Sequence, residues 1–128
     1  MKRNVSKRVL VVDDDWGMQE LLQTLLEFEN YEAIIAENGL VALEKLETVK
    51  PDLILLDLMM PEMDGFTFVE ELQRRKLDSF IPILVMTAGA HVKARAEQMG
   101  LHNYLEKPFD LFHFLDLLTR LLYPVESC

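Results

Sequence analysis

The chain of 128 residues has the length of a single domain, since compact domains most often contain roughly 100–150 residues. Half of the residues are apolar, which excludes a disordered acidic tail, and the net charge of −9, from 13 basic and 22 acidic residues, opposes direct binding to nucleic acid. The single cysteine is the final residue, Cys128, which excludes an internal disulfide and fits a reducing compartment.

No targeting or membrane-spanning segment is visible in the sequence. The basic segment 1–8 is followed by only a short apolar run, Val9–Val12, and three aspartates come directly after that run. A signal peptide needs a longer apolar core, and a membrane span needs about 20 apolar residues. The most apolar stretch, 111–125, contains Asp116 and Arg120. We therefore expect a cytoplasmic protein that makes no membrane contact.

The first half of the chain alternates between short apolar runs and stretches of helical periodicity. Val9–Val12 predicts a first strand, and apolar residues that recur at intervals of three and four over 18–26 predict an amphipathic helix after it. A second strand is predicted at 32–36, and a second helix at 40–46 behind a turn signal.

The second half continues the same alternation. The predicted order is a strand at 53–56, a helix at 66–72, a strand at 83–86, a weaker helix at about 90–99, a short strand at 104–105 and a helix at 111–122. Units of this kind predict the α/β fold class, a doubly wound parallel sheet with helices on both faces and right-handed crossovers.

Charged and hydroxyl side chains stand where the predicted strands end. The run Asp13–Asp15 follows the first strand, and Asp57 follows the third. Thr87 ends the fourth strand, and Lys107 comes shortly after the fifth. In an open parallel sheet, ligands bind outside the carboxyl ends of the strands. We therefore expect these side chains to meet at one edge of the sheet.

The acids at this edge restrict the chemistry available there. Carboxylates held within a few ångströms of one another repel and become protonated unless a positive charge is present. Oxygen ligands without a neighbouring histidine or cysteine favour Mg²⁺, and the charges of Asp13, Asp14 and Asp57 would be balanced by one Mg²⁺ and Lys107. Asp57, alone at its strand end, is the natural nucleophile toward phosphorus.

Four segments of the chain together resemble the response-regulator receiver domains of two-component signalling. They are VVDDD at 11–15, LLDLMMPEMDG at 55–65, MTA at 86–88 and YLEKPF at 104–109. Four such segments in this order are highly specific, and the resemblance covers about residues 8–122. It implies a flavodoxin-like sheet of five parallel strands in the order 2-1-3-4-5.

The resemblance also implies a metal and phosphoryl site. Asp57 would accept a phosphoryl group from a sensor histidine kinase, a phosphotransfer protein or a small donor such as acetyl phosphate. Asp14, Asp57 and the backbone carbonyl of Met59 would ligate Mg²⁺, with Asp13 acting partly through water. The protein would catalyse only its own phosphorylation and dephosphorylation, and would not be an enzyme acting on an external substrate.

Further residues would bind the phosphoryl group and report its presence. The Thr87 hydroxyl, the Ala88 N–H and the Lys107 ammonium would each contact a phosphoryl oxygen, with a cis peptide bond between Lys107 and Pro108. Tyr104 occupies the aromatic switch position of the family. Its movement together with Thr87 would alter the face formed by the last two helices and the last strand.

The implied domain spans residues 1–122, of which the first seven are a basic lead-in, and residues 123–128 form a tail or the start of a linker. The helix at 111–122 has an apolar arc too wide for one sheet face, so that Phe112 and Leu117 are expected to be partly exposed. Either neighbouring helices cover them, or the face formed by the last two helices and the last strand pairs with a second copy of the chain.

Simpler roles exist for the same residues. Asp13 and Asp14 suit a helix-capping loop, although Asp15 is better placed for that role. Thr87 suits a strand, and Tyr104 suits core packing. Lys107 suits an exposed surface.

Other classes of protein fit the sequence less well. A phosphatase of the haloacid-dehalogenase type needs a second aspartate two residues after the nucleophile, where Met59 stands here. A flavin or nucleotide carrier needs a glycine-rich loop after the first strand, where acids stand instead. A receiver-like module that binds partners without phosphorylation would not need the complete set of acids, threonine and lysine.

Overall fold

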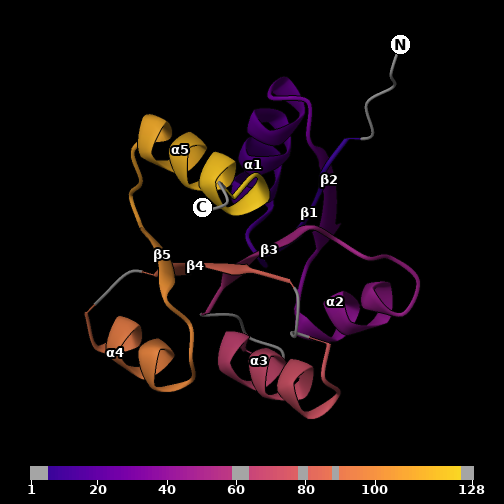
Figure 1. The fold of residues 1–128 in the computed structure, drawn as a ribbon, viewed down its shortest axis with the longest axis vertical. Helices are drawn as coiled ribbons and strands as arrows, with labels where there is room; N and C mark the ends of the chain where they lie inside the picture. The colour runs from indigo at the N-terminus through magenta and orange to yellow at the C-terminus, as the bar shows by residue number, and fades with distance from the viewer. Residues whose placement is uncertain (1–5, 59–63, 78–80, 88–89, 125–128) are drawn as a thin grey trace.

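The computed structural model describes residues 6–58, 64–77, 81–87 and 90–124, and these form five strands and five helices in alternation (Figure 1). The strands are β1 (Arg8–Val12), β2 (Glu32–Ala36), β3 (Leu53–Asp57), β4 (Ile83–Thr87) and β5 (Asn103–Glu106). The helices are α1 (Trp16–Phe28), α2 (Gly39–Leu46), α3 (Gly65–Arg74), α4 (Ala90–Gln98) and α5 (Leu111–Leu122). Each predicted element is present, and its bounds differ from the prediction by a few residues at most.

The five strands form one parallel sheet in the order β2-β1-β3-β4-β5, which confirms the predicted fold class and topology. In the register between β1 and β3, Val12 lies opposite Leu56. The residues that follow these two, Asp13 and Asp57, therefore stand side by side at the carboxyl edge of the two central strands. The topology alone brings together two acids that are far apart in the sequence.

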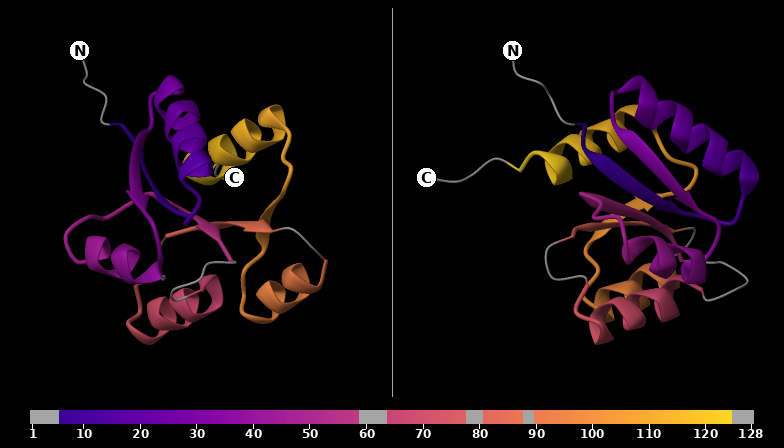
Figure 2. Two further views of the ribbon diagram at one scale, coloured as in Figure 1. Left: turned by 180° about the vertical axis from the view of Figure 1, so that it is seen from behind. Right: turned by 90° about the vertical axis from the view of Figure 1, so that its right-hand side faces the viewer.

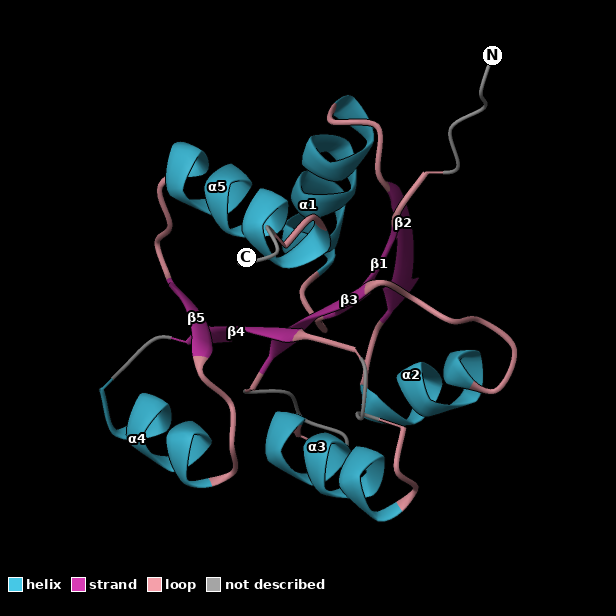
Figure 3. Ribbon diagram, viewed as in Figure 1, coloured by secondary structure: helices cyan, strands magenta, loops and turns pink. Residues whose placement is uncertain are grey.

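Helices cover both faces of the sheet, with α1 and α5 on one face and α2, α3 and α4 on the other (Figures 1, 2 and 3). Strand residues contact the two layers alternately: Val9 and Val11 belong to the core under α1 and α5, whereas Leu10 and Val12 belong to the core over α2, α3 and α4. Burial on both sides explains why the central strands are continuously apolar.

Among the described residues, four helices begin with a side-chain cap. Asp15, Asn38, Asp64 and Asp110 each accept a hydrogen bond from the backbone N–H three residues further on. Such caps contribute about 1 kcal/mol each, and here they also fix where the chain turns from strand to helix. Asp15 therefore has the capping role that the sequence suggested for it, which leaves Asp13 and Asp14 available for other contacts.

Helix α4 is the least apolar of the five, as predicted from its sequence. Among its described side chains, Val92 and Ala96 are buried. The guanidinium of Arg95 lies 3.9 Å from the centroid of the Phe66 ring, a cation–π contact that joins α4 to α3. Across the described part of the chain, every helix is too short or too polar to span a bilayer.

Gly65 begins α3 where the chain passes closely over the end of β3. Its N–H donates to the carbonyl oxygen of Leu58 at 3.0 Å. A Cβ at this position would lie 2.6 Å from the Leu58 Cα and 2.9 Å from the carbonyl oxygen of Asp57, both of which are backbone atoms that cannot move aside easily. The close approach requires glycine here.

We therefore predict that Gly65→Ala lowers the free energy of unfolding by roughly 1–3 kcal/mol, as measured by urea denaturation. Gly17→Ala is the matched control, because the nearest atom to a Cβ there is a side-chain oxygen of Asp15 at 3.6 Å. This control should leave stability unchanged or raise it by up to about 1 kcal/mol. Equal effects of the two substitutions would contradict the packing argument.

Candidate metal centre

Three carboxylates converge at the carboxyl edge of β1 and β3. Asp13 and Asp14 follow β1, and Asp57 is the last residue of β3. One ligand oxygen from each of these residues lies within 4.8 Å of the other two. Asp13 and Asp57 are buried, whereas Asp14 is exposed, so the cluster opens to solvent on one side.

The backbone around Asp13 is held on several sides. Its N–H donates to the carbonyl oxygen of Ala36 at 3.1 Å, which ties the loop to the end of β2. Its Oδ1 accepts the backbone N–H of Asp15 at 2.9 Å. The Asp15 carboxylate in turn accepts the Met18 N–H at 2.8 Å, which begins α1. The acidic loop is therefore ordered by hydrogen bonds that leave one Asp13 oxygen, Oδ2, directed elsewhere.

Lys107 supplies positive charge to the same cluster from the loop after β5. Its Nζ lies 3.8 Å from Asp57 Oδ2 and 3.9 Å from Asp13 Oδ2. The Lys107–Pro108 peptide bond is cis, as the family resemblance implied. The ring of Phe109 packs against that of Phe114 in α5, with 5.2 Å between centroids, and this contact anchors the loop. The ammonium thus lies between two of the three acids.

Asp13 is the carboxylate whose charged form this arrangement disfavours. Its Oδ2 is buried and has no hydrogen-bond partner among the described residues. Burial raises the pKa of Asp13 from 3.8 to about 6, and the Asp57 carboxylate adds to the rise, while the Asp15 N–H and Lys107 oppose it. A buried carboxylate oxygen without a hydrogen bond is unfavourable, and the Lys107 ammonium at 3.9 Å compensates for this only in part.

The donor set fits a hard divalent cation. All the candidate ligand atoms are carboxylate oxygens, which suit Mg²⁺. Three carboxylates and one ammonium carry a net charge of −2 when ionised, which one Mg²⁺ would neutralise. Asp13, Asp14 and Asp57 are the described residues that would hold the ion. Met59, whose carbonyl the resemblance assigned to the same ion, lies outside the described residues.

The structure describes the other expected site residues only in part. Thr87 is the last residue of β4 and lies opposite Glu106 in the sheet. The side chain of Thr87 and the whole of Ala88 lie outside the part of the chain that the structure describes.

Tyr104 lies in β5 and packs against the core beneath α4. Its hydroxyl donates to the carbonyl oxygen of Leu101, and Lys93 Nζ lies 5.0 Å from the centroid of its ring. Burial raises the pKa of the Tyr104 hydroxyl, and the carboxylate of Glu97 on α4 contributes to the rise. Tyr104 therefore combines core packing with contacts to α4, so both roles considered from the sequence are compatible with its surroundings.

Two features of the site were not predicted from the sequence. The first is Gln19, whose Nε2 donates to the carbonyl oxygen of Asp13 at 2.7 Å. A glutamine within an amphipathic helix is ordinarily a solvated residue, and the available signal was its place one turn after the capping Asp15. The second is an apolar groove beside Lys107.

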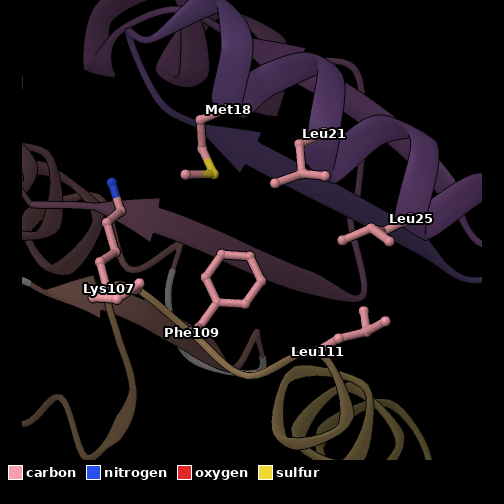
Figure 4. A pocket seen from close by; sticks show the side chains of 7 residues that line it. Met18, Leu21, Leu25, Lys107, Phe109 and Leu111 are labelled. Carbon is pink, nitrogen blue, oxygen red and sulfur yellow. The ribbon is translucent and has the colours of Figure 1, made fainter.

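The groove lies between α1 and the loop that joins β5 to α5 (Figure 4). Its volume is about 370 Å³, and it is lined by Met18, Leu21, Leu25, Lys107, Pro108, Phe109 and Leu111. Leu21 and Leu111 are 45% and 41% exposed, so the groove presents apolar surface to solvent. Lys107 contributes to both the groove and the acidic cluster, which makes the two features adjacent.

Comparison with known proteins identifies the family. The profile of the response regulator receiver domain matches residues 9–119. The chain therefore belongs to the response regulator receiver domains, which are signalling domains of two-component systems and not enzymes in the ordinary sense.

Individual relatives agree with this assignment. The alkaline phosphatase synthesis transcriptional regulatory protein PhoP of Bacillus subtilis is 42% identical over 107 residues, which is 82% of this chain and 44% of the relative. The response regulator MprA of Mycobacterium ulcerans is 39% identical over 120 residues, 92% of this chain and 51% of the relative. The chain thus spans about half the length of these curated relatives.

Solved structures agree as well. The chemotaxis protein CheY4 of Vibrio cholerae has a TM-score of 0.83 and 31% identity, and the match covers 92% of this chain and 100% of that one. The response regulator TrrA of Thermotoga maritima, solved in complex with Mg²⁺ and BeF, has a TM-score of 0.80 and 34% identity, with 91% and 99% covered.

Asp13 links the stability of the cation-free domain to pH. Because its pKa is about 6 in the folded state and 3.8 ordinarily, the folded domain binds a proton more tightly than the unfolded chain between these values. Stability due to this group is therefore present at low pH and lost as pH rises through about 6. We predict a loss of roughly 1–2 kcal/mol between about pH 5 and about pH 7.5 in buffer with EDTA.

Urea denaturation of the wild type and of Asp13→Asn at both pH values measures this component. Asp13→Asn should lack this pH-dependent component of stability. At the higher pH it should be more stable than the wild type, because its neutral amide replaces a buried charge. Asp116→Asn, on the exposed surface of α5, is the control and should follow the wild type. Parallel pH dependences for wild type and Asp13→Asn would contradict the assignment.

Proposed function

We propose that this receiver domain takes a phosphoryl group onto Asp57 in an Mg²⁺-dependent reaction. The donor is a sensor histidine kinase, a phosphotransfer protein or a small molecule such as acetyl phosphate. The observation that carries the proposal is the position of the Lys107 ammonium, 3.8 Å from Asp57 and 3.9 Å from Asp13, within a cluster of three carboxylates.

Transfer from acetyl phosphate illustrates the chemistry. A carboxylate oxygen of Asp57 attacks phosphorus, a new P–O bond forms, and the bond to the leaving acetate breaks with its electron pair. When bound, Mg²⁺ neutralises negative charge on the phosphoryl oxygens. Lys107 contributes the remaining positive charge. Asp14, Asp57 and the Met59 carbonyl would hold the ion, with Asp13 acting partly through water. Positioning and charge neutralisation supply most of the catalysis in such reactions.

The proposed response to phosphorylation involves residues on the neighbouring strands. The Thr87 hydroxyl and the Ala88 N–H bind phosphoryl oxygens, and Tyr104 turns as Thr87 moves. Support for a role of Tyr104 in signalling comes from its contacts with α4, since a change in its ring position would break the contact with Lys93. The altered surface comprises α4, β5 and α5.

The groove beside Lys107 supports a protein donor. A donor histidine must reach Asp57 while its own protein binds nearby, and exposed apolar surface next to the acids meets that need. The domain itself is proposed to bind no nucleic acid, in keeping with its charge of −9. Residues 1–122 are proposed as the receiver, followed by a tail or the start of a linker at 123–128.

Intact-mass measurement after incubation with Mg²⁺ and acetyl phosphate tests the phosphoacceptor. The wild type should gain one phosphoryl group, and Asp57→Asn should gain none, because the amide is not a nucleophile toward phosphorus. Asp116→Asn, which removes an exposed carboxylate on α5, should behave as the wild type. An equal gain in the wild type and Asp57→Asn would remove Asp57 from its proposed role.

The exposed ring of Phe112 supports pairing of two copies through the α4-β5-α5 face. Phe112 is 77% exposed, whereas Leu117, the other residue expected at this boundary, is only partly exposed and packs against the core. We predict that sedimentation velocity with Mg²⁺ and acetyl phosphate shows a dimer for the wild type and a monomer for Phe112→Ser. Phe28→Ser, which removes a similarly exposed ring at the end of α1, should still dimerise. A wild type that stays monomeric at high concentration would contradict this pairing.

A further inference from the structure

One residue of α1 contacts the acidic loop through both its backbone and its side chain. The N–H of Gln19 donates to the carbonyl oxygen of Asp15 at 2.9 Å, as expected in the first turn of a helix. Its side-chain Nε2 donates to the carbonyl oxygen of Asp13 at 2.7 Å, in a partly buried position. The second bond is not a helix contact, because Asp13 lies outside α1.

The Asp13 carbonyl belongs to the peptide unit that joins Asp13 to Asp14. A hydrogen bond to this oxygen therefore sets the orientation of the peptide plane between two candidate ligands. The N–H of Asp13 is held by Ala36, and its Oδ1 is held by the Asp15 N–H. With the Gln19 bond, every polar atom of Asp13 except Oδ2 has a hydrogen-bond partner. The oxygen left over is the one that lies 3.9 Å from the Lys107 ammonium.

The chemistry of glutamine suits this place. Its amide donates a hydrogen bond without adding charge, so it orders the loop and leaves the net charge of −2 that attracts a divalent cation. An arginine or lysine side chain could donate a hydrogen bond to the same carbonyl oxygen, but its positive charge would cancel part of the attraction for the cation. An apolar side chain would preserve the charge but leave the peptide unit without its partner.

We propose that Gln19 is a positioning residue for the divalent-cation site, acting through the Asp13–Asp14 peptide unit. The proposal rests on the cation binding of the proposed function. Mg²⁺ requires near-ideal octahedral geometry, whereas Ca²⁺ accepts irregular coordination at longer distances. Positioning by Gln19 therefore matters more for Mg²⁺ than for Ca²⁺, and it contributes to the preference of the site between the two ions.

The test is to titrate the full chain with Mg²⁺ and, separately, with Ca²⁺. Calorimetry and tryptophan fluorescence measure the binding. Trp16, the single tryptophan, is 70% exposed and begins α1 directly after the acidic loop, which makes it a local reporter. Gln19→Met keeps the length of the side chain and the helix propensity but removes the donor. Gln23→Met is the matched control, since Gln23 lies one turn later in α1 and bonds only to the exposed Glu27 in the described structure.

Gln19→Met should weaken Mg²⁺ binding about 10-fold, in the range found for residues that orient metal ligands, and should weaken Ca²⁺ binding by no more than about threefold. Gln23→Met should leave both affinities unchanged. Gln19→Ala provides a second variant and should show the same loss of preference for Mg²⁺.

A Mg²⁺ affinity within about twofold of the wild type, or an equal loss for both ions, would overturn the role of Gln19. If the wild type takes up phosphate on Asp57 and yet Gln19→Met binds Mg²⁺ normally, this inference alone fails. If the wild type binds no divalent cation, the proposed function fails, and the role of Gln19 fails with it.

Discussion

Repulsion among three carboxylates is the constraint around which this site is built. A parallel sheet places the ends of β1 and β3 side by side, and the register sets Asp13 next to Asp57. Left alone, such a cluster would take up protons, and the pKa of Asp13 already rises to about 6 through burial. Lys107 lowers the negative charge without removing it. The remaining charge of −2 suits a divalent cation, and we propose that the cation in turn allows a phosphoryl group to bind.

The surrounding fold keeps these groups in place by ordinary means. The core on each face of the sheet fixes the strands, so that their ends cannot drift apart. Helix caps determine where the helices begin, and Asp15 performs this role for α1 beside the cluster itself. Close packing of Gly65 over the end of β3 holds the backbone that carries Asp57. Stability and site geometry therefore depend on the same few turns.

Much of the fold could be predicted from the sequence, because hydrophobic periodicity reflects directly which residues are buried. The central strands are buried on both faces, and they were visible as continuous apolar runs. The prediction that the acids at the strand ends meet in one site followed from the rule that ligands bind at the carboxyl edge of a parallel sheet. The rule names the edge but not the contacts within it. Gln19 was missed because a polar side chain on a helix gives no sign of which carbonyl it will reach. Phe112 and Leu117 were both expected to be partly exposed. Leu117 is so, whereas Phe112 is 77% exposed, because the angle at which α5 packs against the sheet sets the exposure of each side chain at the edge of its apolar arc, and periodicity does not fix that angle.

We infer that distant segments of the chain form one anionic site for a single divalent ion. Anomalous diffraction from crystals grown with Mn²⁺ tests it most directly, because Mn²⁺ accepts the same oxygen ligands and can be located without ambiguity. We predict one strong peak within about 2–2.5 Å of carboxylate oxygens of Asp14 and Asp57, with the Lys107 ammonium beside the same cluster. The absence of a peak there, or a peak elsewhere with these carboxylates turned apart, would contradict it.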